Sequence, residues 1–336
     1  MHRNRKLLSL VFALVLLCSC ALLTGCQTSE LQTVRVNEVT HSVFYAPQYA
    51  AMELGFFEEE GLSVELTNGG GADKVMTALL AHQADIGLMG PESGIYVLNE
   101  GKQDNAMVIG QLTKRDGSFL VGRTEIENFD WSQLKGSDII GGRKGGVPLM
   151  SLESTLRKKG LEPGVDVSVD DSIQFNLMAG AFEGGEGDFV TMFEPTASMF
   201  EQEGKGVILA SVGEAGGEVP FTAYFAQRST IEQDPEMMQK FVRAINKGLQ
   251  WVHSHSAQEI AEVIAPQFPD TSVELLTTVT QRHLDIDAWV QTPVMESYAL
   301  DNLQDIMEQA GELKQRVEFD QLVDNSFAEQ AAADQK

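Results

Sequence analysis

Cysteine is absent from most of the sequence. The chain has only Cys18, Cys20 and Cys26, and none follows in the rest of its 336 residues. A disulfide framework and a thiolate metal site are therefore excluded beyond Cys26. No set of His, Asp and Glu has metal-ligand spacing, and His253 and His255 lie two residues apart on a predicted helix, so they point to different faces. We expect neither a metal nor a cofactor.

Positive charge is also scarce. The chain has 24 Lys and Arg against 49 Asp and Glu. Removal of residues 1–25 would take away three basic residues and no acidic one, which leaves 21 against 49 and a net charge of −28. Such a balance argues against nucleic-acid binding and against a polybasic contact with anionic lipid.

Catalytic motifs are missing as well. The run "GGRKGGVP" (141–148) is rich in glycine but lacks the terminal Lys-Ser/Thr of a Walker A loop, so nucleotide hydrolysis is not supported. Neither a G-x-S-x-G elbow nor a Ser/His/Asp constellation is legible. We expect a protein that is not an enzyme.

The N-terminus has the layout of an export signal. Basic residues precede an apolar run at 7–17 that is too short to span a bilayer. The run "LLTGC", ending at Cys26, resembles the lipobox of bacterial lipoproteins, and "LCSC", ending at Cys20, matches less well. The alternative is a cysteine that happens to end a cleaved signal. We expect residues 1–25 to be removed, 26–32 to form a tether, and a lipid on Cys26 to anchor the exported protein to the outer face of the cell membrane, or in the periplasm where there are two membranes.

The remaining sequence alternates short apolar runs with helical periods. This pattern is typical of an α/β fold whose sheets are mostly parallel and flanked by helices. The same order of elements occurs twice, and amphipathic helices follow the second copy. We predict a discontinuous lobe 1 (33–120 and 222–328), an inserted lobe 2 (121–221) and a flexible tail (329–336).

Candidate site residues follow from one rule. In open α/β sheets the ligand binds at the carboxyl ends of the strands. The residues that this rule selects are His41, Ser42, Tyr45, Gly70, Gly71, Glu92 and Ser93 in lobe 1, and Gly145, Gly146, Phe193 and Glu194 in lobe 2. Two such sets facing each other across a hinge would close on a small molecule.

Structural roles remain open for several of these residues. Tyr45 can pack under the helix that follows it, and the glycines can form tight turns as well as bring backbone N–H groups to a ligand. Glu92 can complement the dipole of its own helix. Arg143 and Lys144 make their loop the most anion-friendly part of lobe 2, but we expect both side chains at the surface.

Glu194 follows an apolar run and precedes a proline, where an ionised carboxylate is costly unless it is paired. It could cap its own helix, form an ion pair with lobe 1, or accept N–H donors of a ligand. A carboxylate in the cleft would repel a sulfonate or nitrate but could bind the amino group of a 4-aminopyrimidine, with Tyr45, Phe193 or Phe221 stacked on the ring. This charge favours an amine-bearing heterocycle over an anion.

Three runs carry a resemblance to a known family. "HSVFYAPQYAAMELGFFEEEGLSVEL" (41–66), "GGGADKVMTALLAHQADIGLMG" (69–90) and "GDFVTMFEPTAS" (187–198) resemble the SsuA/THI5-like (NMT1) family of ABC-transporter solute-binding proteins. The resemblance implies a two-lobed periplasmic-binding-protein fold (type II-like) with the ligand cleft between the lobes. It also implies a small-molecule ligand and ABC permease and ATPase subunits as partners.

The resemblance leaves the ligand open. Family ligands include alkanesulfonates, taurine, nitrate and pyrimidine precursors of thiamine, and Glu194 favours a thiamine-related aminopyrimidine over the anions. THI5-like pyrimidine synthases share the fold, but they use pyridoxal phosphate and a cysteine-rich motif, and neither an internal cysteine nor a recognisable cofactor lysine motif is present. A ligand-sensing lipoprotein that serves a receptor would look the same in sequence.

Overall fold

The structure, a computed structural model, describes residues 30–334. The predicted signal segment and Cys26 lie outside the described residues. From Thr33 onward the described residues form one compact unit, which contains both sheets. Among the described residues, no helix is long and apolar enough to cross a membrane.

The first sheet has the strand order β2-β1-β3-β10-β4. Its strands are β1 (Gln32–Glu38), β2 (Leu62–Asn68), β3 (Ile86–Met89), β4 (Ala106–Thr113) and β10 (Thr222–Gln227). β3, β4 and β10 are buried along their whole length, as apolar strands are when helices cover both faces of a sheet. β10 comes from late in the chain, so this sheet combines two separate parts of the sequence.

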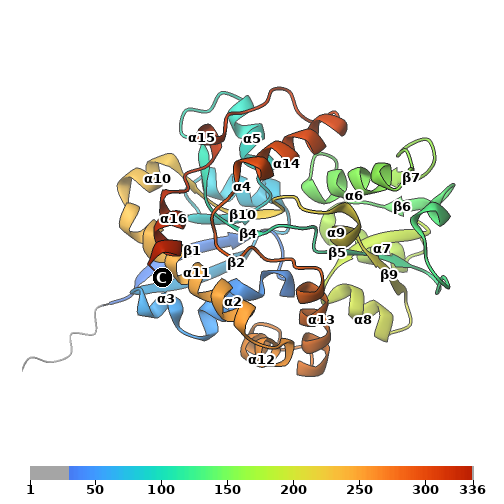
Figure 1. Cartoon of the computed structure of the whole chain (residues 1–336), viewed down its shortest axis with the longest axis horizontal. Coiled ribbons are helices and arrows are strands. Elements are labelled where there is room, and N and C mark those ends of the chain that lie inside the picture. The colour runs from blue at the N-terminus through green and yellow to red at the C-terminus, as the bar shows by residue number, and fades with distance from the viewer. Residues whose placement is uncertain (1–29, 335–336) are drawn as a thin grey trace, which may run out of the picture. The chain divides into compact units, whose positions relative to one another are not determined.

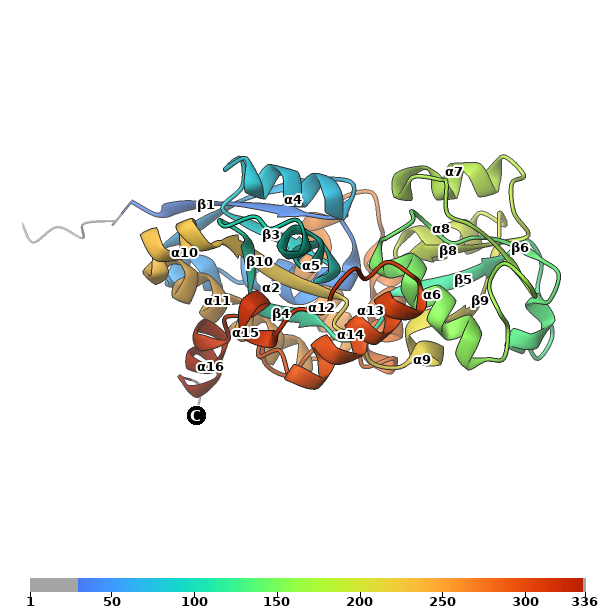
Figure 2. The same cartoon turned by 90° about the horizontal axis from the view of Figure 1, so that it is seen from above.

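The second sheet has the order β7-β6-β8-β5-β9. Its strands are β5 (Ser118–Gly122), β6 (Asp138–Ile140), β7 (Ser168–Asp170), β8 (Phe189–Phe193) and β9 (Val207–Ser211). Figures 1 and 2 show these strands grouped with α6, α7, α8 and α9, and apart from the strands of the first sheet. The two sheets and their helices form the two lobes of an α/β fold, here called lobe 1 and lobe 2.

Each sheet contains one strand that runs antiparallel to its neighbours. β1 and β3 are parallel, and so are β6 with β7 and β8, whereas β10 is antiparallel to β3 and β4, and β5 is antiparallel to β8 and β9. β5 and β10 are the strands that follow the two crossings between the lobes, at 114–117 and 217–221. A strand that enters its sheet from the other lobe starts at the edge where the parallel strands end, so it must run in the opposite direction.

Helices surround both sheets. In lobe 1 they are η1 (Val43–Tyr45), α2 (Ala46–Glu53), α3 (Phe56–Glu59), α4 (Ala72–Leu80), α5 (Glu92–Asn99), α10 (Arg228–Gln233), α11 (Pro235–Ser254), α12 (Ala257–Ile264), η4 (Ala265–Gln267), α13 (Val273–Asp285), α14 (Ser297–Gln309), α15 (Phe319–Leu322) and α16 (Ser326–Ala333). In lobe 2 they are η2 (Trp131–Leu134), α6 (Val147–Lys158), η3 (Phe175–Leu177), α7 (Met178–Glu183), α8 (Thr196–Gln202) and α9 (Val212–Gly216).

Long helices of lobe 1 begin at clear sequence signals. The Asp234 side chain accepts a hydrogen bond from the Met237 backbone N–H at the start of α11, and Pro235 occupies the first turn. Ser256 and Glu259 form a capping box at the start of α12. The apolar face of α11 packs on α2 and α16, so these three helices form one packed group within the helical cover of lobe 1.

The C-terminal segment differs from the sequence-based prediction. A flexible tail was expected from residue 329, but α16 continues to Ala333 and packs on α11. Phe327, Ala328 and Ala331 are buried there, and the Asn246 side chain donates a hydrogen bond to the Ala331 carbonyl at 2.8 Å. Small apolar residues at helical spacing provide a packing face that an alanine-rich composition conceals.

Candidate ligand-binding cleft

Two neighbouring cavities lie between the carboxyl ends of the strands of the two lobes. The first, here the Glu92 cavity, has a volume of about 60 Å³ and is lined from lobe 1 by Tyr45, Gly71, Glu92 and Phe221 and from lobe 2 by Arg143, Gly146, Val147 and Phe193, among others. The second, the Asn176 cavity, has a volume of about 180 Å³ and contains His41, Ser42, Gly70, Asn176, Thr191 and Glu194 in its lining. Thr40, Phe175 and Phe193 line both cavities.

A larger cavity, of about 290 Å³, lies elsewhere. It is lined by Gln111, Lys114, the crossing at 218–220 and the segment before and within the first turns of α14. No candidate site residue lies in its lining. The cleft, where strand ends of both lobes meet, is therefore the candidate ligand site.

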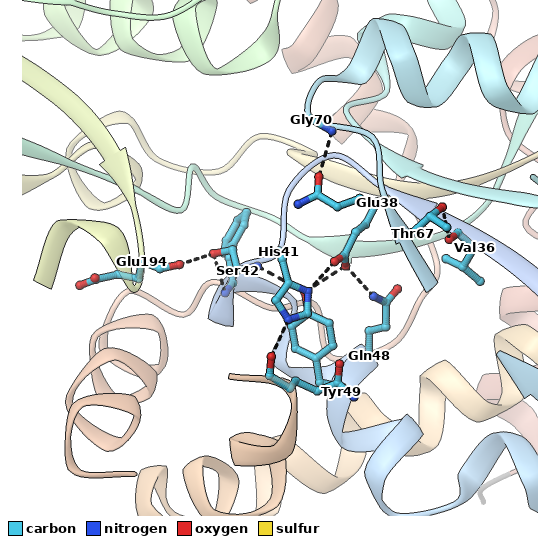
Figure 3. Close-up of polar contacts among 12 residues, drawn as sticks. Val36, Glu38, His41, Ser42, Gln48, Tyr49, Thr67, Gly70 and Glu194 are labelled. Atoms are coloured by element: carbon cyan, nitrogen blue, oxygen red, sulfur yellow. Dashed lines mark hydrogen bonds and ion pairs between the residues drawn. The ribbon is translucent and has the colours of Figure 1, made fainter. Parts of the chain in front are cut away.

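Ser42 joins the two lobes. Its hydroxyl donates a hydrogen bond to the Glu194 backbone carbonyl at 2.6 Å and accepts one from the Phe44 N–H at 3.2 Å, which caps η1 (Figure 3). Tyr45, the last residue of η1, is buried and lines the Glu92 cavity. Its ring therefore packs in the core and is also placed to contact a ligand. This short segment therefore ties the end of β1 to lobe 2.

His41 is held by a buried network. Its Nδ1 lies 2.7 Å from Glu38 Oε1 and its Nε2 lies 2.9 Å from the Gln267 carbonyl oxygen, while Glu38 Oε2 accepts hydrogen bonds from Gln48 and Tyr49 (Figure 3). Burial raises the pKa of Glu38 despite these bonds. Burial lowers the pKa of His41, but the Glu38 and Gln267 contacts outweigh it and the net shift is upward. His41 lines the Asn176 cavity, but both ring nitrogens are occupied by protein partners.

The two glycines after β2 serve a turn and a cavity at once. Gly70 has a φ of 68°, and its N–H donates to the Asn68 side chain at 2.9 Å. Gly71 precedes α4 with a φ of 152°, where an added Cβ would lie 2.8 Å from Asp73 Oδ1. Gly70 lines the Asn176 cavity and Gly71 the Glu92 cavity. A side chain at either position would be strained whether or not a ligand is present.

Glu92 places a buried carboxylate in the cleft. It is the first residue of α5, only 1% of it is exposed, and its Oε1 accepts a hydrogen bond at 3.1 Å from the N–H of Val147, the first residue of α6 in lobe 2. Its Oε2 is buried without a hydrogen-bond partner in the described part of the chain. Burial raises the pKa of Glu92 to about 7, against the lowering effect of the Val147 N–H and the Arg143 charge.

Ser93, the next residue, is buried on α5 but lines neither cavity. The structure therefore does not bring this predicted site residue to the cleft.

The loop after β6 meets lobe 1 at several points. Gly146 lines the Glu92 cavity, whereas Gly145 does not and instead accepts a hydrogen bond from the Tyr96 hydroxyl at 2.8 Å. Lys144 has a side chain that is 71% exposed, as expected, and lies 3.7 Å from Glu312. Arg143 differs from the expectation, because it is half-buried in the cavity wall and lies 3.6 Å from Asp73. A loop that faces another lobe shields side chains that would be solvated on an isolated one.

Phe193 is at the centre of an aromatic group. Its ring centroid lies 5.5 Å from that of Phe175, 5.8 Å from that of Phe44 and 5.9 Å from that of Phe221. These distances are typical of favourable ring pairs. The cleft therefore offers flat apolar surfaces from both lobes, and Phe175 joins those that sequence reasoning had selected.

Glu194 faces the protein rather than open space. Its Oε2 accepts the Ser198 N–H at 2.9 Å, and its Oε1 accepts the Ser198 hydroxyl at 2.8 Å and Arg282 Nη1 at 2.7 Å. Arg282 lies on α13 of lobe 1, and its other amino group lies 3.1 Å from Glu201. These contacts match two of the three roles left open by the sequence, the helix cap and the ion pair with lobe 1. Both carboxylate oxygens already have donors, so the preference for an amine that rested on this charge loses its main support.

The lobes are in a closed arrangement. Hydrogen bonds cross the cleft from Ser42 to Glu194, from Val147 to Glu92 and from Tyr96 to Gly145, and the Arg282–Glu194 ion pair crosses it as well. Arg282 was not selected from the sequence, because no local pattern marks a residue that pairs with a segment 88 positions away. Thr40 and Phe175 were also missed, although both follow strands and the rule of strand ends applies to them.

Comparisons with known proteins agree with this architecture. The NMT1/THI5-like family model matches residues 43–259. The Bacillus subtilis (strain 168) protein YtlA, provisionally named a binding protein, is 42% identical over 313 residues, which cover 93% of this chain and 94% of that protein.

Solved structures share the fold at low identity. The alkanesulfonate-binding protein SsuA of Xanthomonas axonopodis pv. citri, bound to MOPS, superposes with a TM-score of 0.70 at 17% identity over 89% of this chain and 100% of its own. The nitrate-binding protein NrtA of Synechocystis PCC 6803 gives 0.70 at 14% identity over 91% and 89%. The extent of the family match and the identity with YtlA lead to one conclusion: the chain belongs to the NMT1/THI5-like family.

Proposed function

We propose that this protein is an extracytoplasmic solute-binding protein of an ABC importer and that its ligand is a small heterocycle with N–H donors, of the class of thiamine-related aminopyrimidines. The family, the two-lobed fold and the name of YtlA support the solute-binding role. The permease and ATPase subunits are partners that this role requires. The lining of the cleft supports the class of the ligand.

The carboxylate of Glu92 carries the proposal. The first N–H groups of a helix are a ready site for an anion, because they lack partners within the helix and lie at the positive end of its dipole. In the cleft, Glu92 already fills this place at the start of α6 through its bond to Val147. The protein thus supplies its own anion where a sulfonate or nitrate would otherwise bind, and a second negative group there would be repelled.

The unpaired Glu92 Oε2 favours a ligand that carries a hydrogen-bond donor. A buried acceptor without a donor is costly, and a ligand that brings an N–H group removes that cost. Tyr45, Phe193 and Phe221 line the same cavity and can contact both faces or the edge of a flat ring. An exocyclic amino group on a pyrimidine ring satisfies both features together.

An anionic ligand is the second candidate, and one observation favours it. Arg143 lines the same cavity, and the raised pKa of Glu92, about 7, means that protonation at mildly acidic pH would remove the repulsion. An alkanesulfonate, taurine or nitrate would then bind best below pH 7. We do not extend the proposal to a pyrimidine synthase, because no feature of the described cleft calls for a reaction.

Ligand screening tests the proposed function. A ligand that binds only the folded state raises the melting temperature, by an amount that grows with its concentration over its dissociation constant. We expect 4-amino-2-methylpyrimidine or its 5-hydroxymethyl derivative to raise it at pH 8, and alkanesulfonate, taurine and nitrate to have no effect there. Native mass spectrometry of the freshly purified protein would identify a retained ligand. Stabilisation by an anion at pH 8, with none by either pyrimidine, would replace our proposal with the second candidate.

Membrane anchoring rests on the sequence alone, since Cys26 lies outside the described residues. We expect Cys26→Ser to release the protein from the membrane fraction, because the thiol is the attachment point of the proposed lipid. Cell fractionation measures this, with Cys20→Ser as the matched control that should stay bound. Persistent membrane association of the Cys26→Ser protein would exclude the lipobox assignment.

A further inference from the structure

The Asn176 cavity is a space next to the proposed ring site that the ring itself does not use. Its volume, about 180 Å³, exceeds the 60 Å³ of the Glu92 cavity. Both cavities share Thr40, Phe175 and Phe193 in their linings, so these side chains are the partition between them. A ligand held in the first cavity therefore lies against the wall of the second.

The lining of the Asn176 cavity carries no available charge. Neither lysine nor arginine is part of it, the Glu194 carboxylate is paired with Arg282, and both ring nitrogens of His41 have protein partners. The hydroxyls of Thr40, Thr191 and Thr196 and the amide of Asn176 are different, because no hydrogen bond joins them to another described residue. Met178, Met192 and Phe175 provide apolar surface around these polar groups.

This lining matches one class of chemical group. Hydroxyls and an amide can each donate and accept, so they suit a substituent that is itself an alcohol or an amide. Thr191 is buried on β8, and a hydroxyl in such a place gains from a partner that solvent cannot readily supply. A phosphate or carboxylate would find neither lysine nor arginine there, and His41, whose pKa is raised, is already paired with the Glu38 carboxylate, so the desolvation of the anion would be poorly compensated.

We infer that the ligand is bipartite, with the N–H-bearing ring in the Glu92 cavity and an uncharged, hydrogen-bonding arm in the Asn176 cavity. This inference rests on the proposed function and specifies the ligand of that same site. Thr191 and Asn176 are then the residues that select the arm. Both residues lie in lobe 2, whereas Glu92 lies in lobe 1, so one ligand would contact specificity-determining side chains of both lobes.

Phe175 is the side chain that must give way. It lies on η3, a single short turn without a side-chain cap, and the next residue but one, Leu177, is 57% exposed. Its ring contact is with Phe193, at 5.5 Å. Because this half-buried side chain lines both cavities and lies on a short turn, we expect its rotation to be the smallest change that opens one cavity to the other.

A matched series of three compounds tests the inference. The probes are 4-amino-2-methylpyrimidine, the same ring with a 5-(3-hydroxypropyl) arm, and the same ring with a 5-butyl arm of equal length. Titration calorimetry on the ligand-free mature protein at pH 8 gives the dissociation constants. We expect the hydroxypropyl compound to bind at least about fivefold more tightly than the bare ring and than the butyl compound, as one or two net hydrogen bonds would provide.

Two substitutions test whether the Asn176 cavity causes the gain in affinity from the hydroxypropyl arm. Asn176→Ala changes an exposed residue, and Thr191→Val keeps the shape of a buried one while removing its hydroxyl. The double variant should bind the bare ring as the wild type does and lose most of the gain from the hydroxypropyl arm. Gln174→Ala, an exposed neighbour that lines neither cavity, is the control and should retain the gain.

The outcomes separate this inference from the proposed function. Equal affinity for the bare ring and the hydroxypropyl compound, or an equal gain from butyl, overturns the bipartite ligand and leaves the proposed function in place. A gain that survives in the double variant overturns the role of Asn176 and Thr191. Failure of all three compounds to bind overturns the proposed function and this inference together.

Discussion

Glu92→Gln is expected to weaken the binding of 4-amino-2-methylpyrimidine by about 5- to 150-fold, the equivalent of roughly 1–3 kcal/mol for a charge-assisted hydrogen bond. Glutamine has the same shape, and its carbonyl oxygen can still accept the Val147 N–H. Its amide nitrogen, however, is a donor and would meet the donor of the ligand where Oε2 now offers an acceptor. Titration calorimetry at pH 8 measures the change.

The same substitution should stabilise the ligand-free protein at high pH. Burial raises the pKa of Glu92 from 4.5 to about 7, so between these values the folded state holds a proton that the unfolded state has lost. The free energy of unfolding of the wild type therefore falls as the pH rises through this window. Above pH 7 the full cost, on the order of 3 kcal/mol, is present, and glutamine does not carry it. Urea unfolding of both proteins at pH 4.5 and pH 8 measures the difference.

Glu100→Gln is the matched control for both measurements. Glu100 is exposed at the other end of α5 and lines neither cavity, so neither affinity nor the pH dependence of stability should change. A Glu92→Gln protein that binds the pyrimidine as tightly as the wild type would contradict the role of Glu92 in recognition. A stability difference that is the same at pH 4.5 and pH 8 would contradict the cost of its buried charge.

Arg282→Met should be the most destabilising of the substitutions considered for the ligand-free protein. It leaves the Glu194 carboxylate, whose side chain is 0% exposed, without its cation. Removal of one partner from a buried pair costs about 3–5 kcal/mol. We expect about 3 kcal/mol, because the Arg282 side chain is 26% exposed and the pair is partly screened. Urea unfolding at pH 7 measures the loss.

The reverse substitution should be milder. Glu194→Gln leaves Arg282 with solvent and with Glu201 as a remaining partner, and glutamine can still accept from Ser198, so we expect a loss of about 1 kcal/mol. The double variant Arg282→Met/Glu194→Gln should recover part of what Arg282→Met loses. Arg316→Met, which breaks an exposed cluster with Asp305 and Glu308, is the control at about 1 kcal/mol or less. Equal losses from the two single substitutions would show that the burial of Glu194 does not govern the pair.

Local patterns in the sequence were enough to predict most of the fold. The alternation of apolar runs and helical periods marks β1, β2, β3 and β8, because each is followed by a polar loop and a helix start. β4 and β5 lack this signal, because β4 leads directly into the crossing to β5, and β5 is followed by the segment 123–130 before η2 rather than by a helix start. The two-lobed α/β fold and the family were predicted correctly.

The site was predicted less completely, for a physical reason. The rule of strand ends selects loops, and nine of the eleven selected ligand-binding residues line a cavity, Ser93 and Gly145 being the exceptions. It does not say which carboxylate meets the other lobe and which remains free. That choice depends on Arg282 and Val147, which come from distant parts of the chain, and so the free acceptor proved to be on Glu92 rather than on Glu194.

The position of β10 also governs the order in which the chain can assemble. β3 and β4 are not neighbours in their sheet, because β10 lies between them. Lobe 1 therefore has an open edge on both strands until residues 222–227 arrive, whereas all five strands of lobe 2 lie within 118–211. The inserted lobe can complete its sheet first, while the lobe that begins the chain must wait for a strand from beyond it. Such a nascent chain carries unpaired edges for about a hundred residues, which is the kind of intermediate that chaperones protect.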